Sequence, residues 1–307
     1  MSTHPLLEVR HIHKSFAHSD RQDIKVLADC HLKIEHGEIV ALLGKTGSGK
    51  STLLRIMAGL IPPTSGEVLC NNQVVTSTTP GLSMVFQDFA LFPWLTVLQN
   101  VELGLEAMGM NRAERRHKAL KAIDIVGMDG FESAYPKELS GGMCQRVGFA
   151  RALVVEPDLM LMDEPFSALD VLTAENLRSD LLDLWLGKKT QMKGIFMVTH
   201  NIEEAALLAN RILVFDANPG YVKDEIINAL PYPREEHTQA FKDIVERVYQ
   251  SITQKPSAKS ATPAAKTIDM HYRLPSVTIS ELSGLVETLI SQEYENRVDL
   301  PELGEDL

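Results

Sequence analysis

Residues 44–52 carry the residue types that bind a chain of phosphates. They read Gly-Lys-Thr-Gly-Ser-Gly-Lys-Ser-Thr and fit the pattern G-x-x-x-x-G-K-[ST]. In this pattern small residues let successive backbone N–H groups converge on an anion at the start of a helix. Lys50 then reaches the outer phosphates, and the Ser51 hydroxyl can bind Mg²⁺. Because an apolar run precedes the loop, we favour a nucleotide site over an ordinary strand-to-helix turn. Its residues are Gly44, Lys45, Thr46, Gly47, Ser48, Gly49, Lys50, Ser51 and Thr52.

A second sequence, of a different kind, also has the composition of a phosphate site. Residues 139–142 read Leu-Ser-Gly-Gly and stand directly ahead of residues 143–151, which are predicted to form a helix. The N–H groups at the N-terminus of such a helix are free to bind a γ-phosphate. By itself this sequence supplies only half of a nucleotide site.

Two adjacent carboxylates, Asp163 and Glu164, follow an apolar run at residues 159–162. A strand at that run would place both at the edge of a sheet, one towards a metal ion and the next able to polarise a water molecule. We therefore predict Glu164 to be a catalytic base. The alternative is a solvated acidic turn.

Short apolar runs at residues 39–43, 159–162, 195–198 and 212–215 predict the strands that position these groups. Continuous apolar runs suit parallel strands covered on both faces, and open α/β sheets bind ligands at the C-terminal ends of such strands. Alternation at Val26, Ala28, Cys30, Leu32 and Ile34, and within residues 6–12, predicts antiparallel strands with one buried face.

Apolar residues three to four positions apart predict helices over residues 96–108 and 112–126, and a further helix over about residues 237–252. The first two would lie in a helical insert of about residues 88–140. The Pro/Ala/Ser/Lys tract at 254–266 has no periodicity, which is typical of a flexible linker.

In their order along the chain, these motifs resemble those of the ATP-binding subunits of ABC transporters, over about the first 250 positions. Residues 91–97, Leu-Phe-Pro-Trp-Leu-Thr-Val, and residues 148–170 are most similar to the ATPases of nitrate, sulfonate, taurine and bicarbonate uptake systems. The resemblance implies an α/β fold of the P-loop NTPase class. Such a fold has a RecA-like, mostly parallel sheet core, an antiparallel β subdomain and an inserted α-helical subdomain.

The resemblance also implies roles for single residues at the nucleotide and metal. Ser51 and Asp163 would hold Mg²⁺, Asp163 through water. Gln87 would sense the metal and link the core to the helical insert, and His200 would contact the γ-phosphate. The expected catalytic residues are Glu164, His200, Lys50 and Gln87, and the expected metal residues are Ser51, Gln87 and Asp163. His200 alone could equally be a structural histidine.

Further roles involve the adenine ring and a second copy of the chain. Phe16 stands where the family more often has a tyrosine that stacks on adenine, although it could also be a strand-end core residue. Ser140, Gly141 and Gly142 would contact the γ-phosphate bound to a second copy, arranged head to tail, and Asp170 would reach across that dimer. Hydrolysis is therefore expected to need two copies.

An apolar and aromatic cluster, Phe89, Leu91, Phe92, Pro93 and Trp94, follows Gln87. It could simply be part of the core. The resemblance implies instead that this region receives a short helix of a membrane permease, and aromatic side chains suit a protein interface.

The bulk properties of the 307 residues fit these expectations. The net charge of −11 disfavours sequence-independent nucleic-acid binding. Three single cysteines suit a reducing compartment, and no run approaches the ~18 apolar residues of a membrane span. We expect a cytoplasmic protein, peripheral on the inner face of the cell membrane, with no leader sequence.

Three segments are expected: an ATPase domain at 1–253, the linker at 254–266 and an acidic segment at 267–307. The last segment resembles the start of the AAA-associated C-terminal domain of some of these ATPases and is too short to complete it. The leading hypothesis for the whole chain is ATP hydrolysis that drives uptake of a small anion through a separate permease, served indirectly by a solute-binding protein. The alternative is a soluble ABC ATPase acting on nucleic acid or ribosomes.

Overall fold

The computed structural model describes residues 4–17, 23–187 and 190–254. All of these lie in one compact unit, residues 1–255. The expected acidic segment at 267–307, and the expected linker from residue 255 onward, lie outside the described residues. No helix in the described ranges is long and apolar enough to cross a membrane.

A six-stranded sheet forms the centre of this unit, in the order β10-β9-β3-β8-β7-β6. Its strands are β3 (Glu38–Gly44), β6 (Leu82–Val85), β7 (Leu159–Asp163), β8 (Gly194–Thr199), β9 (Arg211–Asp216) and β10 (Tyr221–Ile227). All neighbours are parallel except β9 and β10, which are antiparallel. Every residue of β7 and β8 is buried, as their continuous apolar runs predict.

A smaller antiparallel sheet packs against the first, in the order β2-β1-β4-β5. Its strands are β1 (Leu7–Phe16), β2 (Ile24–Ile34), β4 (Ser65–Cys70) and β5 (Gln73–Val74). The predicted alternation in β2 is wrong in its first half. Leu27, rather than Val26 or Ala28, is fully buried, because the pairing with β1 shifts register there and Asp29 takes a left-handed conformation with φ 52°.

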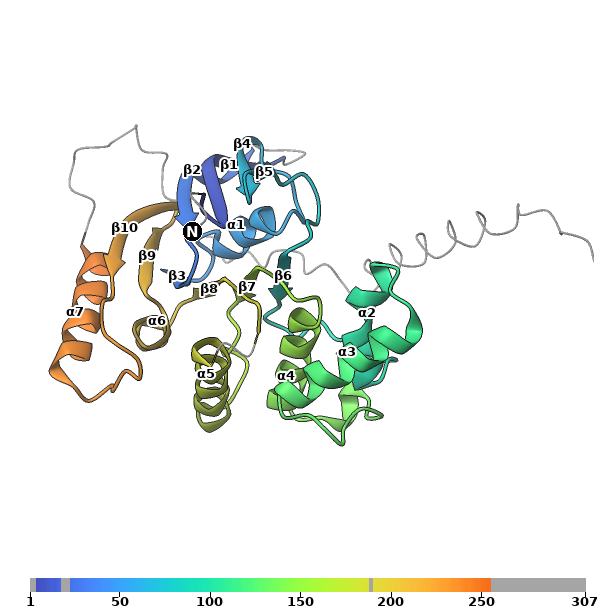
Figure 1. Ribbon diagram of the computed structural model, residues 1–307. Helices are drawn as coiled ribbons and strands as arrows, with labels where there is room; N and C mark the ends of the chain where they lie inside the picture. The colour runs from blue at the N-terminus through green and yellow to red at the C-terminus, as the bar shows by residue number, and fades with distance from the viewer. Residues whose placement is uncertain (1–3, 18–22, 188–189, 255–307) are drawn as a thin grey trace, which may run out of the picture. The chain divides into compact units, whose positions relative to one another are not determined.

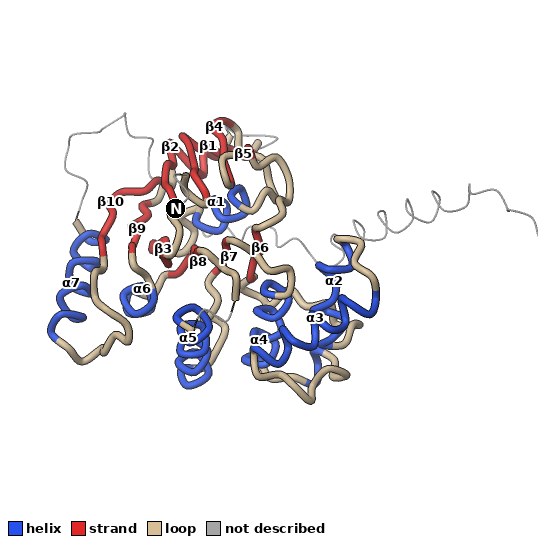
Figure 2. The backbone as a smooth tube through the Cα atoms, viewed as in Figure 1, coloured by secondary structure: helices blue, strands red, loops and turns tan. Residues whose placement is uncertain are grey.

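The helices are α1 (Lys50–Met57), α2 (Val97–Ala107), α3 (Arg112–Ile125), α4 (Gly141–Leu153), α5 (Val171–Leu186), α6 (Ile202–Leu208) and α7 (Gln239–Thr253), with a 3-10 turn at Pro136–Glu138. The predicted bounds for α2, α3 and α7 agree within two residues. Helices α2, α3 and α4 pack on one another and gather at the β6 edge of the sheet, whereas α6 and α7 lie beside β9 (Figures 1 and 2).

Two hydrophobic cores lie on opposite faces of the large sheet, and alternate residues of β3 enter them. Ile39, Ala41 and Leu43 pack with the helices from α2 to α7. Val40 and Leu42 pack with α1 and the antiparallel sheet. Helix α1 therefore lies between the two sheets (Figure 1). Because both faces of the sheet are covered, the C-terminal ends of its parallel strands are where polar side chains can gather.

Candidate nucleotide-binding site

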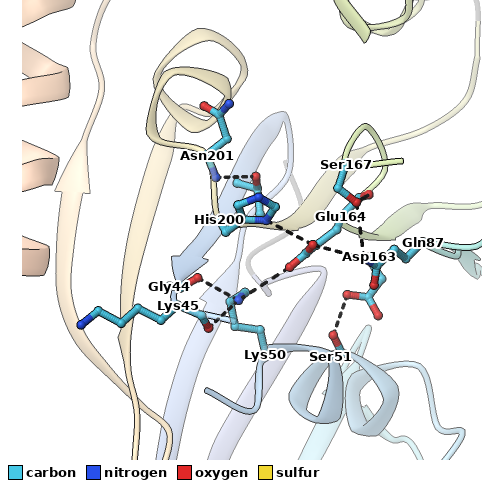
Figure 3. Close-up of polar contacts among 11 residues, drawn as sticks. Gly44, Lys45, Lys50, Ser51, Gln87, Asp163, Glu164, Ser167, His200 and Asn201 are labelled. Carbon is cyan, nitrogen blue, oxygen red and sulfur yellow. Dashed lines mark hydrogen bonds and ion pairs between the residues drawn. The ribbon is translucent and has the colours of Figure 1, made fainter. Parts of the chain in front are cut away.

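Four adjacent strands, β3, β8, β7 and β6, end at the same edge of the large sheet. The segments that follow them carry the Gly44–Lys50 loop, His200, Glu164 and Gln87, respectively. The strand order thus brings together four segments that are widely separated in the sequence (Figure 3).

Lys50 is the cation at the centre of this edge. Its side chain is only 4% exposed, and its Nζ donates to the carbonyls of Gly44 and Lys45 at 2.8 and 2.9 Å. The same Nζ lies 3.8 Å from Oε1 of Glu164. Burial lowers the pKa of Lys50, and the charges of Glu164 and Asp163 oppose that shift. The lysine is therefore held inside its own loop, with an acidic group within reach.

The loop ahead of α1 has the conformation that an anion cradle requires. Gly47 and Gly49 have φ of 78° and 99°, which other residues rarely adopt. A Cβ at Gly49 would also lie 2.9 Å from a methyl group of Leu27. Gly49 provides no side-chain cap for α1, and the first turn has no acidic residue. The N-terminus of α1 is therefore left for an anion, and a triphosphate fits the residues present.

Ser51 and Asp163 offer two oxygen groups of the kind that a hard cation binds. The Ser51 hydroxyl donates to Oδ1 of Asp163 at 2.8 Å, although the two residues are 112 positions apart. Asp163 is 4% exposed at the end of β7, and burial raises the pKa of its carboxyl against the effect of the Ser51 bond. Hydroxyl and carboxylate oxygens are suitable ligands for Mg²⁺, so this pair fits the metal.

Glu164 connects the other predicted catalytic residues. Its Oε2 lies 3.1 Å from Nδ1 of His200 and accepts a bond of 3.4 Å from the Gln87 amide (Figure 3). Its backbone is left-handed, with φ 44°, and its N–H donates to the Val198 carbonyl at 3.0 Å. The structure therefore brings together Lys50, Gln87, Glu164 and His200, all four predicted from the sequence.

The remaining predicted residues lie apart from this group. Ser140 caps α4 and accepts from the Met143 N–H at 3.3 Å, while Asp170 caps α5 and accepts from Thr173 at 3.1 Å. Phe16 is 38% exposed at the end of β1, and the ammonium of Lys14 lies 5.0 Å from its ring centroid. In the described part of the chain, none of the hydrogen bonds of Ser140 or Asp170 reaches the Lys50 loop.

The glycines of the second phosphate sequence lie against the start of α5. A Cβ at Gly142 would lie 2.3 Å from a methyl group of Thr173, which leaves glycine as the residue that fits there. Gly141 and Gly142 form the first turn of α4, so the expected helix begins two residues earlier than residue 143. This sequence and Asp170 therefore occupy neighbouring helix starts.

Three residues near the site were not singled out from the sequence. The hydroxyl of Ser167 lies 3.5 Å from the Gln87 amide and donates to the Glu164 carbonyl at 3.0 Å. Arg151 donates to the carbonyls of Phe89, at 2.9 Å, and Ala90. Glu204 is buried near His200. For Ser167, the sequence offered one indication of a place in the site: it directly follows the Asp163-Glu164-Pro-Phe run. The sequence offered none for Arg151 or Glu204.

Four features define the class of P-loop ATPases: a mostly parallel sheet, a phosphate loop that ends in Lys-Ser, an aspartate bonded to that serine, and a glutamate–histidine pair. Comparison with known proteins gives its family. The sequence profile of the family described as ABC transporter matches residues 27–167. The chain is 45% identical over 225 residues to the nitrate import ATP-binding protein NrtD of Synechocystis sp., with 73% of this chain and 83% of that protein covered.

Further comparisons indicate the same family. Over 227 residues the chain is 42% identical to the aliphatic sulfonates import ATP-binding protein SsuB of Bacillus cereus, with 74% and 88% coverage. It superposes on the dimeric ATP-binding cassette MJ0796 bound to ADP and Pi with a TM-score of 0.65, at 33% identity, covering 73% of this chain and all of that one. The chain belongs to the ATP-binding proteins of the ABC transporter family, which are ATPases.

Proposed function

We propose that this chain hydrolyses Mg·ATP to energise uptake of a small anion of the nitrate or sulfonate class through a separate membrane permease. The observation that carries the proposal is the position of Glu164, whose carboxylate lies within reach of Lys50, Gln87 and His200 at the edge of the sheet. The similarity to nitrate and sulfonate import ATP-binding proteins supports the choice of solute. No observation favours the alternative of action on nucleic acid or ribosomes, and the net charge of −11 opposes it.

The residues at the sheet edge have distinct tasks in this proposal. The Gly44–Thr52 loop binds the phosphates, and Lys50 turns from the carbonyls of its loop to the outer phosphates. Ser51, Asp163 and Gln87 hold Mg²⁺, which neutralises charge on the phosphates when bound. Glu164 accepts a proton from the attacking water, while His200 orients the Glu164 carboxylate and contacts the γ-phosphate.

A second copy of the chain completes the site. At the start of α4, Ser140 and Gly141 are exposed and Gly142 is buried, and within the described ranges none of the three has a hydrogen bond to the Lys50 loop of its own chain. A head-to-tail dimer would bring them to the γ-phosphate of the other copy, with Asp170 beside them and Phe16 on the adenine ring. The dimeric state of the cassette MJ0796 supports this arrangement.

The segment after Gln87 suits the contact with the permease. The rings of Phe92 and Trp94 pack at a tilt, with centroids 5.4 Å apart and an interplanar angle of 58°, and Trp94 is 53% exposed. A cleft of about 530 Å³ lies beside this segment. It is lined by residues of α2, of α3 and of the turn before the Pro136–Glu138 helix. Docking here would hold the chain on the inner face of the membrane, and a solute-binding protein would act only through the permease.

Replacement of Glu164 by Gln tests the proposed chemistry. The amide cannot accept the proton of the water, so we expect the kcat of ATP hydrolysis to fall by about 100-fold or more. Binding of ATP should persist, and size-exclusion chromatography with Mg·ATP should show a trapped dimer.

Exposed Glu203, replaced by Gln, is the matched control and should behave as wild type. Full turnover of the Glu164→Gln variant would contradict the assignment of the base. A variant that stays monomeric at every ATP concentration would contradict the shared site. Co-purification with ribosomes or DNA, in place of a membrane permease, would overturn the transport function.

A further inference from the structure

Lys14 contacts the ring of Phe16, the side chain proposed above to stack on adenine. The two residues are two positions apart on β1, and side chains at this spacing lie on the same side of a strand. The Lys14 ammonium lies over the ring, 5.0 Å from its centroid. A cation at this distance is attracted by the negative face of an aromatic ring. Phe16 therefore has a charged neighbour on one face of its ring, and the residue is still 38% exposed.

The loop that follows α1 also binds the Lys14 ammonium. The Nζ of Lys14 donates to the Pro62 carbonyl at 2.7 Å. Two further bonds join this loop to the end of β1. The Thr64 N–H donates to the His13 carbonyl at 2.8 Å, and the Ser15 N–H donates to the Thr64 hydroxyl at 2.9 Å. Both chain neighbours of Lys14 are therefore bonded to the same loop that holds its ammonium.

This part of β1 lies close to the phosphate loop. Lys14 is paired with Leu27 of β2 in the register of the antiparallel sheet. Leu27 is fully buried, and a Cβ added at Gly49 of the phosphate loop would lie 2.9 Å from one of its methyl groups. Phe16 stands two residues further along β1, roughly 7 Å from Lys14. Helix α1 begins at the phosphate loop and leads to Pro62. The phosphate loop is therefore linked to the surroundings of Phe16 through both β2 and α1.

We propose that Lys14 is a positioning residue for the adenine of ATP: its ammonium, bound to the Pro62 carbonyl, holds the Phe16 ring and leaves the opposite face of that ring for the base. The inference rests on the stacking role proposed for Phe16. Two stacked rings repel where both faces are negative, and a cation on one side reduces that repulsion. A ring that is already ordered also loses less side-chain freedom when the base binds. Lys14 therefore acts through the base and not through the phosphates.

Titration calorimetry of the full chain with two ligands tests this role. ADP carries the base, whereas pyrophosphate carries phosphates alone, and it can be titrated in competition with ADP. Lys14→Met keeps an apolar stem and removes the charge, so it should weaken ADP binding about two- to fivefold, the range of an exposed cation–π contact. Its affinity for pyrophosphate should equal that of wild type, which also shows that the variant is folded. Lys14→Arg keeps a cation and should bind ADP within about twofold of wild type.

Lys25→Met is the matched control, because Lys25 is an exposed lysine of β2, the strand paired with β1, and it should bind both ligands as wild type does. Phe16→Ala should weaken ADP binding about tenfold, and Lys14→Met should add no further loss in that background.

Three results would overturn the proposal. Equal losses for ADP and pyrophosphate would indicate a general effect of charge. Unchanged or tighter ADP binding by Lys14→Met would show that the ammonium gives the base no support. A further loss in the double variant would show that Lys14 acts without the Phe16 ring. If wild type and Lys25→Met bind neither ligand, the proposed function fails instead.

Discussion

At the scale of single residues, the site depends on unfavourable states that neighbouring groups maintain. Glu164 is held in a left-handed conformation, with φ 44°, by its bond to the Val198 carbonyl. Such a conformation costs a residue with a Cβ about 1 kcal/mol or more. Lys50 is an almost fully buried ammonium, stabilised by two carbonyls of its own loop. The position of Glu164 is therefore set before a nucleotide arrives, whereas Lys50 must exchange these two carbonyls for phosphate oxygens in the proposed reaction.

The raised pKa of Glu204 predicts a pH dependence of stability. A carboxyl whose pKa rises from 4.5 to about 7 on folding stabilises the fold below pH 4.5, and this contribution is lost as the pH rises to about 7. Glu204→Gln imitates the neutral form. Wild type should therefore lose stability relative to this variant between pH 5 and 7, by at most about 3 kcal/mol, with little further change above.

Urea unfolding at a series of pH values measures this difference, with Glu203→Gln as the control. A constant difference between wild type and Glu204→Gln across the range would show that the Glu204 carboxyl stays ionised in the folded chain.

At the scale of elements, Arg151 ties α4 to the segment that follows β6. Its guanidinium donates to the carbonyls of Phe89 and Ala90, both of which are left-handed residues with φ of 63° and 46°. Burial lowers its pKa to about 10, and the charge of Asp88 opposes that shift. Because Gln87 lies in this segment and Ser140 caps α4, the arginine connects two parts that are expected to contact nucleotides bound to different copies.

Replacement of Arg151 by Ala should destabilise the fold by about 2–3 kcal/mol, since two carbonyls lose a charged donor. The midpoint of urea unfolding measures this loss. Arg116→Ala, at an exposed position of α3, is the matched control and should change the midpoint little. We also expect a lower kcat for Arg151→Ala, because Gln87 loses its support. Wild-type stability in this variant would show that the two carbonyls find another donor.

At the scale of the whole molecule, α7 is packed as the last element of the ATPase unit. Phe241, Ile244 and Val248 are buried on its inner face, against α6 and β9. The Lys223 ammonium donates to the Ser251 carbonyl at 2.8 Å and to that of Gln254. The end of α7 is thus fixed to β10, and we expect this unit to fold without the residues that follow.

A chain that ends at residue 254 should therefore keep the melting temperature of the full chain, within about 2 °C, and its basal ATPase rate. Differential scanning calorimetry and a phosphate-release assay check the two quantities. As a comparison, a chain cut before α7, at residue 238, should fail to fold because three buried apolar side chains are removed. Loss of ATPase activity on truncation at 254 would give the later residues a role in catalysis.

The sequence by itself determined the elements and indicated most of the candidate site residues. Three of these patterns are local, because each depends on residues near one another in the chain. They are the Gly-Lys-Ser loop, the apolar run ahead of Asp163, and the helical spacing over 96–108 and 112–126. For that reason the parallel strands, the helices and the residues Lys50, Glu164 and His200 could be predicted before any contact was known.

Only the tertiary structure decided which of these residues touch. The strand order β3-β8-β7-β6 places Ser51 on Asp163 and Glu164 between Gln87 and His200, and no local pattern encodes that order. The same holds for the register shift at Asp29, which buried Leu27 instead of its neighbours. Glu204 reads as an ordinary acidic residue of a first helical turn. Its burial follows from the packing of α6 against the sheet and the neighbouring helices, which long-range contacts alone determine.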